Sequence, residues 1–183
     1  MENNLFILKE VILKNGQKLI LRRVIEDDAE MMIKYLNTIG GESDNLLFGE
    51  NEFHFSVEQE REYINKSNNN NDLIIIGLID NNIVSVANIG KLTRKRIAHN
   101  SEVAISVKRE YWGIGVGYAV MSELIEFAKN NNIKNISLGV KASNNKAFNL
   151  YKKFGFEEVG RHKNFFNVND VFDDEILMDL SLN

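Results

Sequence analysis

A glycine-rich turn is the part of this sequence whose residue types and spacing best suit a binding site. It reads Tyr111-Trp112-Gly113-Ile114-Gly115-Val116-Gly117, with a glycine at every second position. Because glycine has no Cβ, several backbone N–H groups can approach one anion there, beside the positive end of a helix dipole. The spacing therefore predicts a phosphate-binding turn. Taken alone, the glycines also fit a turn that only lets a helix and a strand pack closely.

The segments on either side of the turn are a predicted strand and a predicted helix. Residues 102–107 alternate apolar and polar side chains, as a half-buried strand does. Over residues 117–128 apolar side chains recur at helical spacing, and the asparagines at 130–132 suit a left-handed helix end. The G-x-G-x-G spacing, followed by Tyr118, matches neither the dinucleotide fingerprint nor the P-loop.

A second cluster of candidate residues follows in a predicted short helix that starts near residue 144. Ser143 or Asn144 can cap its first turn, and Gly155 suits the left-handed position after its end. Helical spacing places Asn144 and Tyr151 on one face. The phenol of Tyr151 can donate a proton, although a packed aromatic ring with a satisfied hydroxyl also fits this position.

Composition limits the classes of protein that remain. The 183 residues and 44% hydrophobic content suit a single domain over residues 1–183 with one core. A net charge of -4 argues against a broad nucleic-acid surface. There is no cysteine, and the three histidines are dispersed, so we expect no disulfide and no metal site.

No signal peptide and no membrane-spanning segment is expected from the sequence. The first residues lack a basic segment followed by an apolar run, and no stretch is long and apolar enough to cross a bilayer. We therefore expect a cytoplasmic protein without a membrane partner. Abundant Asn, Lys and Ile with no Pro suggest an AT-rich bacterial genome.

The combination of strand, x-G-x-G-x-G turn, long helix, strand and N-x-x-A-x-x-x-Y-x-x-x-G-F closely resembles the GNAT-type N-acetyltransferase family. The resemblance covers essentially the whole chain and is strongest over residues 102–156. In this family the turn follows [QR]-x-x-G-x-[GA], and its backbone binds the pyrophosphate of acetyl-coenzyme A. Here Trp112 stands at the Gln/Arg position, with Gly115 and Gly117 at the glycine positions. This departure removes a polar side chain but no backbone donor.

The expected fold class is α/β with a mixed, strongly twisted β-sheet of about seven strands flanked by four helices. This is the GNAT-like acyl-CoA N-acyltransferase fold, with the order β-α-α-β-β-β-α-β-α-β-β. The helices are expected at residues 27–36, 56–65, 117–129 and 144–154. The strands are expected at residues 19–24, 73–79, 83–91, 99–107, 135–140, 157–166 and 175–180.

The resemblance also implies cofactor-binding residues. The backbone of Ile105 and Val107 would pair with pantetheine, and Asn144 would bond the cofactor from its helix. The pyrophosphate would lie on the turn residues, namely Gly113, Ile114, Gly115, Val116, Gly117 and Tyr118.

Acetyl transfer needs a neutral amine, a polarised thioester carbonyl and a proton for the departing thiolate. The resemblance assigns the proton donor to Tyr151, and the carbonyl would be polarised by the Val107 N–H. Glu102 is the candidate base, with a solvent-facing strand residue as the other interpretation. Ser106 could instead orient a water.

The acceptor is expected to lie against residues 38–55 and 163–174, which are rich in acidic and phenylalanine side chains. Acidic side chains next to aromatic ones suit a cationic amine such as a polyamine or an aminosugar. Phenylalanines in the core and a solvated acidic loop also explain these residues. A peptide N-terminus is a further acceptor class.

The predicted function is therefore acetyl-coenzyme A-dependent N-acetylation of a small-molecule amine or a peptide N-terminus, without a metal. Two alternatives stay open: a non-catalytic acyl-coenzyme A sensor or partner module of the same fold, and a nucleotide-binding domain with an unrelated reaction. A homodimer is common among the relatives.

Overall fold

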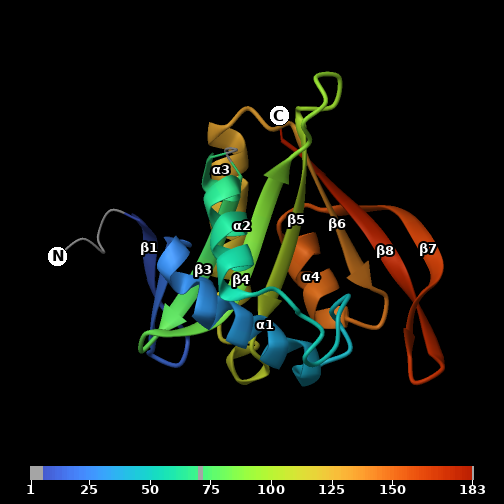
Figure 1. Cartoon of the computed structure of the whole chain (residues 1–183). Coiled ribbons are helices and arrows are strands. Elements are labelled where there is room, and N and C mark those ends of the chain that lie inside the picture. Colours follow the sequence, from blue (N-terminus) through green and yellow to red (C-terminus); the bar gives the residue numbers. More distant parts are fainter. Residues whose placement is uncertain (1–5, 70–71, 183) are drawn as a thin grey trace. The chain divides into compact units, whose positions relative to one another are not determined.

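The computed structural model describes residues 6–69 and 72–182 and shows a mixed α/β protein (Figure 1). The strands are β1 (Ile7–Ile12), β2 (Lys18–Arg23), β3 (Leu73–Ile79), β4 (Asn82–Lys91), β5 (Asn100–Val107), β6 (Asn135–Lys141), β7 (Glu157–Val168) and β8 (Val171–Ser181). The helices are α1 (Ala29–Glu42), α2 (Val57–Asn69), α3 (Val116–Asn130) and α4 (Asn145–Lys153), with 3-10 turns η2 (Glu26–Asp28) and η3 (Arg109–Tyr111).

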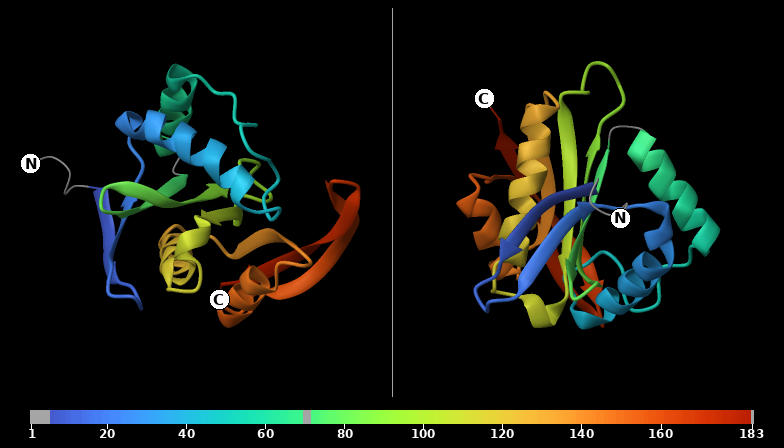
Figure 2. Two further views of the ribbon diagram at one scale, coloured as in Figure 1. Left: turned by 90° about the horizontal axis from the view of Figure 1, so that it is seen from below. Right: turned by 90° about the vertical axis from the view of Figure 1, so that its left-hand side faces the viewer.

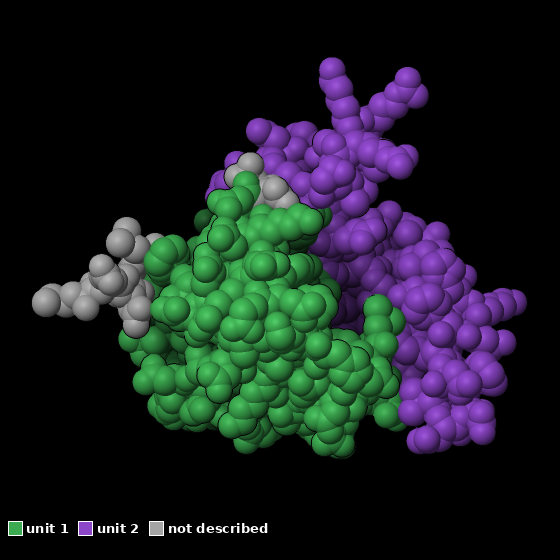
Figure 3. All heavy atoms as spheres, viewed as in Figure 1, with its two compact units in different colours: residues 1–90, 104–127 green, residues 91–103, 128–183 purple. Residues whose placement is uncertain are grey.

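The strands form one mixed sheet in the order β1-β2-β3-β4-β5-β6-β8-β7. The chain divides into two compact units, which Figure 3 shows in separate colours. The first unit contains residues 1–90 and 104–127, and the second contains residues 91–103 and 128–183. Both β5 and α3 contribute residues to each unit.

In the first unit, β1 to β3 pair antiparallel in sequence order, and β3 pairs antiparallel with β4. Every residue of β3 is buried, which explains its unbroken apolar sequence. The helices α1 and α2 cover one face of β3 and β4, and the part of α3 in this unit lies on the other face (Figure 2, left). The core under α1 and α2 includes Val24, Met32, Ile64 and Ile76.

In the second unit, β6 pairs parallel with the first residues of β5 and antiparallel with β8, which pairs with β7. Along β6, Ile136, Leu138 and Val140 are buried, while the residues between them are half-buried or exposed. One face of this sheet therefore carries the apolar core, and the other carries polar side chains.

The structure confirms the fold class, with eight strands where about seven were expected. The additional strand is β1, whose residues Leu8 to Glu10 are all exposed, so its sequence lacks the alternation that marks a half-buried strand. The first helix also runs further than expected, from Ala29 to Glu42 through two glycines. A Cβ on Gly40 would lie 2.1 Å from the Gly49 carbonyl oxygen, so close packing explains that glycine.

Local signals in the sequence were reliable. The Ser56 hydroxyl accepts from the Gln59 N–H, and the Gln59 amide oxygen accepts from the Ser56 N–H, as a capping box requires. Asp80 and Asn81 take positive φ in the β3–β4 turn, as Asn169 and Asp170 do in the β7–β8 turn.

Candidate active site

The glycine turn follows η3 and leads directly into α3. Gly113 and Gly115 have φ of +80° and +114°, which L side chains rarely adopt. A Cβ on Gly113 would meet no atom within 4 Å, so its surroundings are open. The Ala119 N–H donates to the Gly115 carbonyl at 3.0 Å, which closes the first turn of the helix.

The amides of this turn face no internal acceptor. In the described part of the chain, no hydrogen bond is formed by the backbone N–H groups of residues 113 to 117. The carbonyl of Ile114 accepts from the Lys14 N–H at 3.1 Å, and Val116 is buried, so the turn is anchored on its inner side. Gly117 lies in the first turn of α3 and Tyr118 is 55% exposed. Free donors at a helix N-terminus can bind an anion.

Ile105 and Val107 lie half-buried in the last part of β5. The parallel pairing of β5 with β6 covers only Asn100 to Glu102 on β5 and Asn135 to Ser137 on β6. The later residues of β5 therefore have no partner from β6. The Val107 carbonyl accepts the indole N–H of Trp112 at 2.6 Å.

Ser106, the alternative water-orienting residue, is already bonded inside the first unit. Its hydroxyl lies 3.1 Å from the Tyr35 hydroxyl and 3.2 Å from the Val86 carbonyl. Burial raises the pKa of Tyr35, so its hydroxyl stays protonated. These two bonds give Ser106 a structural role between β4 and α1.

Asn144 caps α4, as the sequence predicts. Its Oδ1 accepts from the Ala147 N–H at 3.2 Å, so its side-chain NH₂ group remains to donate. Gly155 takes φ of +91° after the end of the helix. Both ends of α4 were thus readable from the residue types.

Tyr151 lies on α4 and is 8% exposed. Its ring packs against Phe156 with centroids 5.9 Å apart, and its hydroxyl makes no hydrogen bond within the described residues. Burial raises the pKa of Tyr151 to about 12, so the phenol is protonated at neutral pH. Tyr151 therefore combines a packed ring with a protonated hydroxyl that has no partner among the described residues.

Glu102 is exposed at the last β5 position that pairs with β6, opposite Ser137. A carboxylate there can meet a cationic ligand from solvent. The structure places Glu102 at the point where the β5–β6 pairing ends.

The expected acceptor segments divide into core and surface residues. Phe166 is buried and Phe48 packs against the core of the first unit, whereas Phe55, Phe165 and Phe172 are exposed. Among the acidic side chains, Asp44, Glu50 and Glu52 are exposed. Glu42 instead accepts the Arg109 N–H at 2.6 Å.

Two carboxylates that the sequence did not indicate are Glu60 on α2 and Glu175 on β8, both buried. Glu175 bonds His162 on β7, and neither oxygen of Glu60 has a hydrogen-bond partner among the described residues. No spacing signals either one, because burial and strand pairing bring together residues that are far apart in the chain.

Within residues 6–69 and 72–182, no group of three or more histidine, aspartate and glutamate side chains is placed to hold a metal ion. The helices in those residues also include none that is long and apolar enough to cross a membrane.

Known proteins resemble this chain in sequence and in fold. Residues 43–156 match the model of the Acetyltransferase (GNAT) family. The L-amino acid N-acetyltransferase AaaT of Escherichia coli (strain K12) is 33% identical over 92 residues, covering 50% of this chain and 57% of AaaT. The [ribosomal protein bS18]-alanine N-acetyltransferase of the same strain is 32% identical over 78 residues, covering 43% and 53%. The chain thus matches just over half the length of these curated relatives.

Among solved structures, an acetyltransferase of the GNAT family from Streptococcus pneumoniae superimposes with a TM-score of 0.86 at 26% identity, covering 90% of this chain and 99% of that one. The family model spans more than half of the 183 residues. The chain belongs to the acetyltransferase (GNAT) family.

Proposed function

We propose that this protein is an acetyl-coenzyme A-dependent N-acetyltransferase that transfers the acetyl group to a primary amine. The observation that carries the proposal is the row of unpaired amides over residues 113–117 at the start of α3. Such a row suits a diphosphate, and the family of this chain supports coenzyme A as its source.

The proposed contacts with acetyl-coenzyme A involve the turn, β5 and Asn144. The pyrophosphate would accept from the turn amides, and pantetheine would pair with the backbone of Ile105 and the Val107 N–H. The side-chain NH₂ group of Asn144 would donate to the cofactor. The same Val107 N–H is the proposed donor to the thioester carbonyl, where negative charge develops.

Tyr151 is the proposed proton donor to the coenzyme A sulfur. Its hydroxyl is unbonded within the described residues, and its pKa of about 12 keeps the proton on the oxygen until a stronger base, the departing thiolate, forms beside it. The packing of its ring against Phe156 would hold the hydroxyl in one orientation.

Glu102 is the proposed acceptor for the proton that an ammonium group must lose before it can attack. An alkyl amine has a pKa of about 10, so at neutral pH almost all of it is protonated. An exposed carboxylate at this position would attract the ammonium group and take its proton, directly or through water.

The acceptor is proposed to be a small-molecule amine, an amino acid or a peptide N-terminus. The names of the two Escherichia coli relatives support the last two classes. The exposed acids of residues 44–52 and the exposed Phe55, Phe165 and Phe172 support a cationic acceptor. The bacterial relatives, and a cosubstrate that is made inside cells, support a place in a bacterial cytoplasm.

The test is release of free thiol from acetyl-coenzyme A by the full chain, measured with a panel of amines. The panel holds an alanine-initiated peptide, free L-amino acids, spermidine and glucosamine. We expect release with at least one of them and an acetylated product by mass spectrometry. Tight coenzyme A binding without release would instead favour a sensor. Competition by adenine dinucleotides, with no effect of acetyl-coenzyme A, would favour an unrelated nucleotide enzyme.

A further inference from the structure

Glu175 on β8 is a buried carboxylate fixed through one oxygen and unbonded at the other. Its side chain is 11% exposed, and its Oε2 lies 2.8 Å from Nδ1 of His162. In the part of the chain that the structure describes, Oε1 makes no hydrogen bond. Within the described residues, the fully enclosed side-chain oxygens without a partner belong to Glu60, Ser85 and Ser101, so Oε1 of Glu175 is accessible and can take a proton from a ligand or from water.

Gly139 on β6 determines where the unbonded oxygen lies. A Cβ built on Gly139 would be 2.2 Å from Oε1 of Glu175, so the carboxylate occupies the space above this glycine. Gly139 is two residues beyond Ser137, the last β6 residue that pairs with β5. Oε1 therefore lies above β6, just past the point where the β5–β6 pairing ends.

Glu175 and Glu102 lie on the same face of the sheet. Paired residues on neighbouring strands point to one face, and so do alternate residues along a strand. Glu102 pairs with Ser137, Gly139 and Lys141 follow at every second position, and Lys141 pairs with Glu175. The opposite face carries the buried apolar side chains, so both carboxylates belong to the polar face.

The groups around Glu175 are mixed in charge, and several are held in place. His162 stacks on Phe165 with centroids 5.5 Å apart, and the Lys141 ammonium lies 5.8 Å from the Phe166 ring centroid. In the described strands, the titratable and charged side chains on the face of Glu175 are His162 and Glu157 from β7, Lys141 from β6, Asp173 and Asp179 from β8, and Glu102 from β5.

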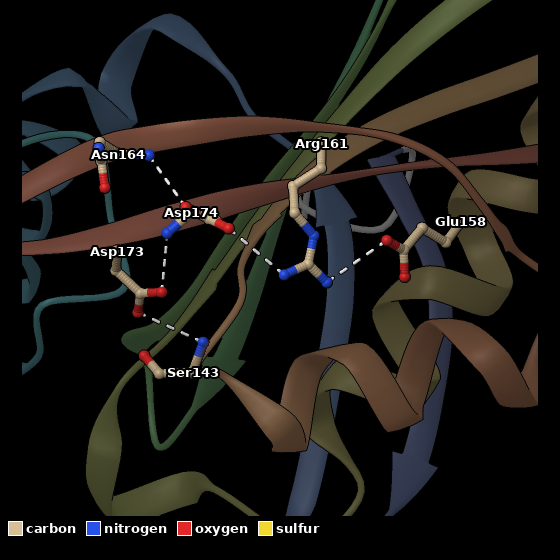
Figure 4. Close-up of polar contacts among 6 residues, drawn as sticks. All are labelled: Ser143, Glu158, Arg161, Asn164, Asp173 and Asp174. Carbon is tan, nitrogen blue, oxygen red and sulfur yellow. Dashed lines mark hydrogen bonds and ion pairs between the residues drawn. The ribbon is translucent and has the colours of Figure 1, made fainter.

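A polar network on the same hairpin fixes the irregular segment that follows His162 (Figure 4). The register of β7 against β8 shifts between His162 and Phe166, where Asn164 takes φ of +53°. The Asn164 N–H donates to Asp174 Oδ1 at 2.9 Å, and Arg161 donates to Asp174 Oδ2 at 3.4 Å. These bonds hold the bulge, so the imidazole is presented to Glu175 by a defined backbone.

An ammonium group loses two protons on its way to an amide. The first must leave before the nitrogen has a lone pair, and the second leaves the nitrogen as the C–N bond forms. We propose that Glu175, positioned by His162, accepts the second proton, while Glu102 accepts the first. This inference rests on the proposed function.

The step balances without another reactant. The amine lone pair attacks the thioester carbonyl carbon, the C–N bond forms, and the C–S bond breaks with its electron pair on sulfur. The nitrogen proton passes to Oε1 of Glu175, and the Tyr151 proton passes to sulfur. After both groups exchange protons with water, each ammonium consumed has given one amide, one coenzyme A thiol and one released proton.

The two carboxylates can be separated by the pH dependence of kcat with the best acceptor of the amine panel. Glu102→Gln should be slow below the pKa of the acceptor and recover toward wild type above it, where the amine is neutral without help. Glu175→Gln should lower kcat by about 100-fold at every pH, because the second proton is still present on the attacking nitrogen.

Gly139→Ala tests the same role while Glu175 and His162 are both kept. Its Cβ would displace only the flexible end of Glu175, and Gly139 has no positive φ, so the fold should survive while kcat falls by about 10-fold or more. His162→Ala should lower kcat, because the carboxylate loses the group that holds its orientation. His162→Gln, which can still donate, should restore part of the loss.

Glu10→Gln is the matched control, since Glu10 is a carboxylate on β1 that is bonded to Lys18 and has no part in the proposal. Its kcat should equal that of wild type. Suppose that wild type acetylates an amine, but Glu175→Gln and Gly139→Ala keep wild-type kcat or recover at high pH as Glu102→Gln does. The role of Glu175 is then wrong, while the proposed function stands. If wild type acetylates no amine, the proposed function itself fails.

Discussion

The indole N–H of Trp112 donates to the Val107 carbonyl at 2.6 Å and so ties the glycine turn to the end of β5. The Arg109 guanidinium lies 6.0 Å from the Trp112 ring centroid, and the Arg109 N–H donates to Glu42 at the end of α1. At the position where the family pattern has Gln or Arg, this chain therefore uses an indole to set the orientation of the Val107 peptide group.

We expect Trp112→Phe to weaken acetyl-coenzyme A binding while leaving the turn glycines intact. The ring stays, but the Val107 carbonyl loses its donor, which should cost about 1 kcal/mol of folding free energy. The KM for acetyl-coenzyme A should rise about fivefold, in line with a loss of about 1 kcal/mol of positioning. Steady-state kinetics and thermal melting check both effects, with Tyr111→Phe as the neighbouring aromatic control. An unchanged KM would assign the indole a packing role only.

Gly115→Asp should abolish coenzyme A binding. The change places a carboxylate and a Cβ at a residue with φ of +114°, beside amides that we assign to the pyrophosphate. Isothermal titration calorimetry with coenzyme A measures the loss. Gly16→Asp, at φ of +85° in the β1–β2 turn, introduces the same charge and comparable backbone strain outside the row of turn amides. Undiminished binding by Gly115→Asp would refute the phosphate assignment.

Tyr151→Phe should lower kcat by about 100-fold and leave the dissociation constant of acetyl-coenzyme A unchanged, because only the acidic proton is lost. Since burial raises the pKa of Tyr151 to about 12, this group remains protonated throughout the range from pH 7 to about pH 10. Wild-type kcat should therefore show no decline assignable to Tyr151 in that range. Tyr63→Phe on α2 is the control, and equal kcat for Tyr151→Phe and wild type would contradict the assignment.

Glu60 makes the free energy of unfolding depend on pH. The residue is 1% exposed, neither oxygen has a partner within the described residues, and burial raises its pKa from 4.5 to about 7. Below pH 4.5 the carboxyl is protonated whether the chain is folded or unfolded, so it imposes no penalty there. As the pH rises from 4.5 through 7, the unfolded chain loses this proton more readily, and the folded state is destabilised.

Glu60→Gln should therefore equal wild type in stability at pH 4 and exceed it at pH 8.5 by up to about 3 kcal/mol. Urea unfolding at the two pH values measures the difference. Glu58→Gln, on the same helix but exposed, removes the same charge and should show no such pH dependence. Equal stability of wild type and Glu60→Gln at pH 8.5 would mean that Glu60 ionises in contact with water.

Much of the fold was predictable because its signals are local. At several positions one residue type is enough to indicate the backbone conformation. These positions are the glycines at 113, 115 and 155, the Asn144 cap, and the turn residues at 80–81 and 169–170. The edge strand β1 was missed because most of its side chains are exposed and leave no alternation to read. The length of α1 was missed because Gly40 acts through contact with Gly49, nine residues away.

By itself the sequence determined where glycines leave the backbone without side chains and where helices begin and end. It also determined which tyrosine and which glutamate are the candidate catalytic residues. Only the tertiary structure decided that the Val107 carbonyl bonds an indole, that Glu60 is buried with no hydrogen-bond partner among the described residues, and that Glu175 meets His162 above Gly139. The physical reason is range: φ preferences and caps depend on a few consecutive residues, whereas burial and strand register depend on segments that meet only in the folded chain.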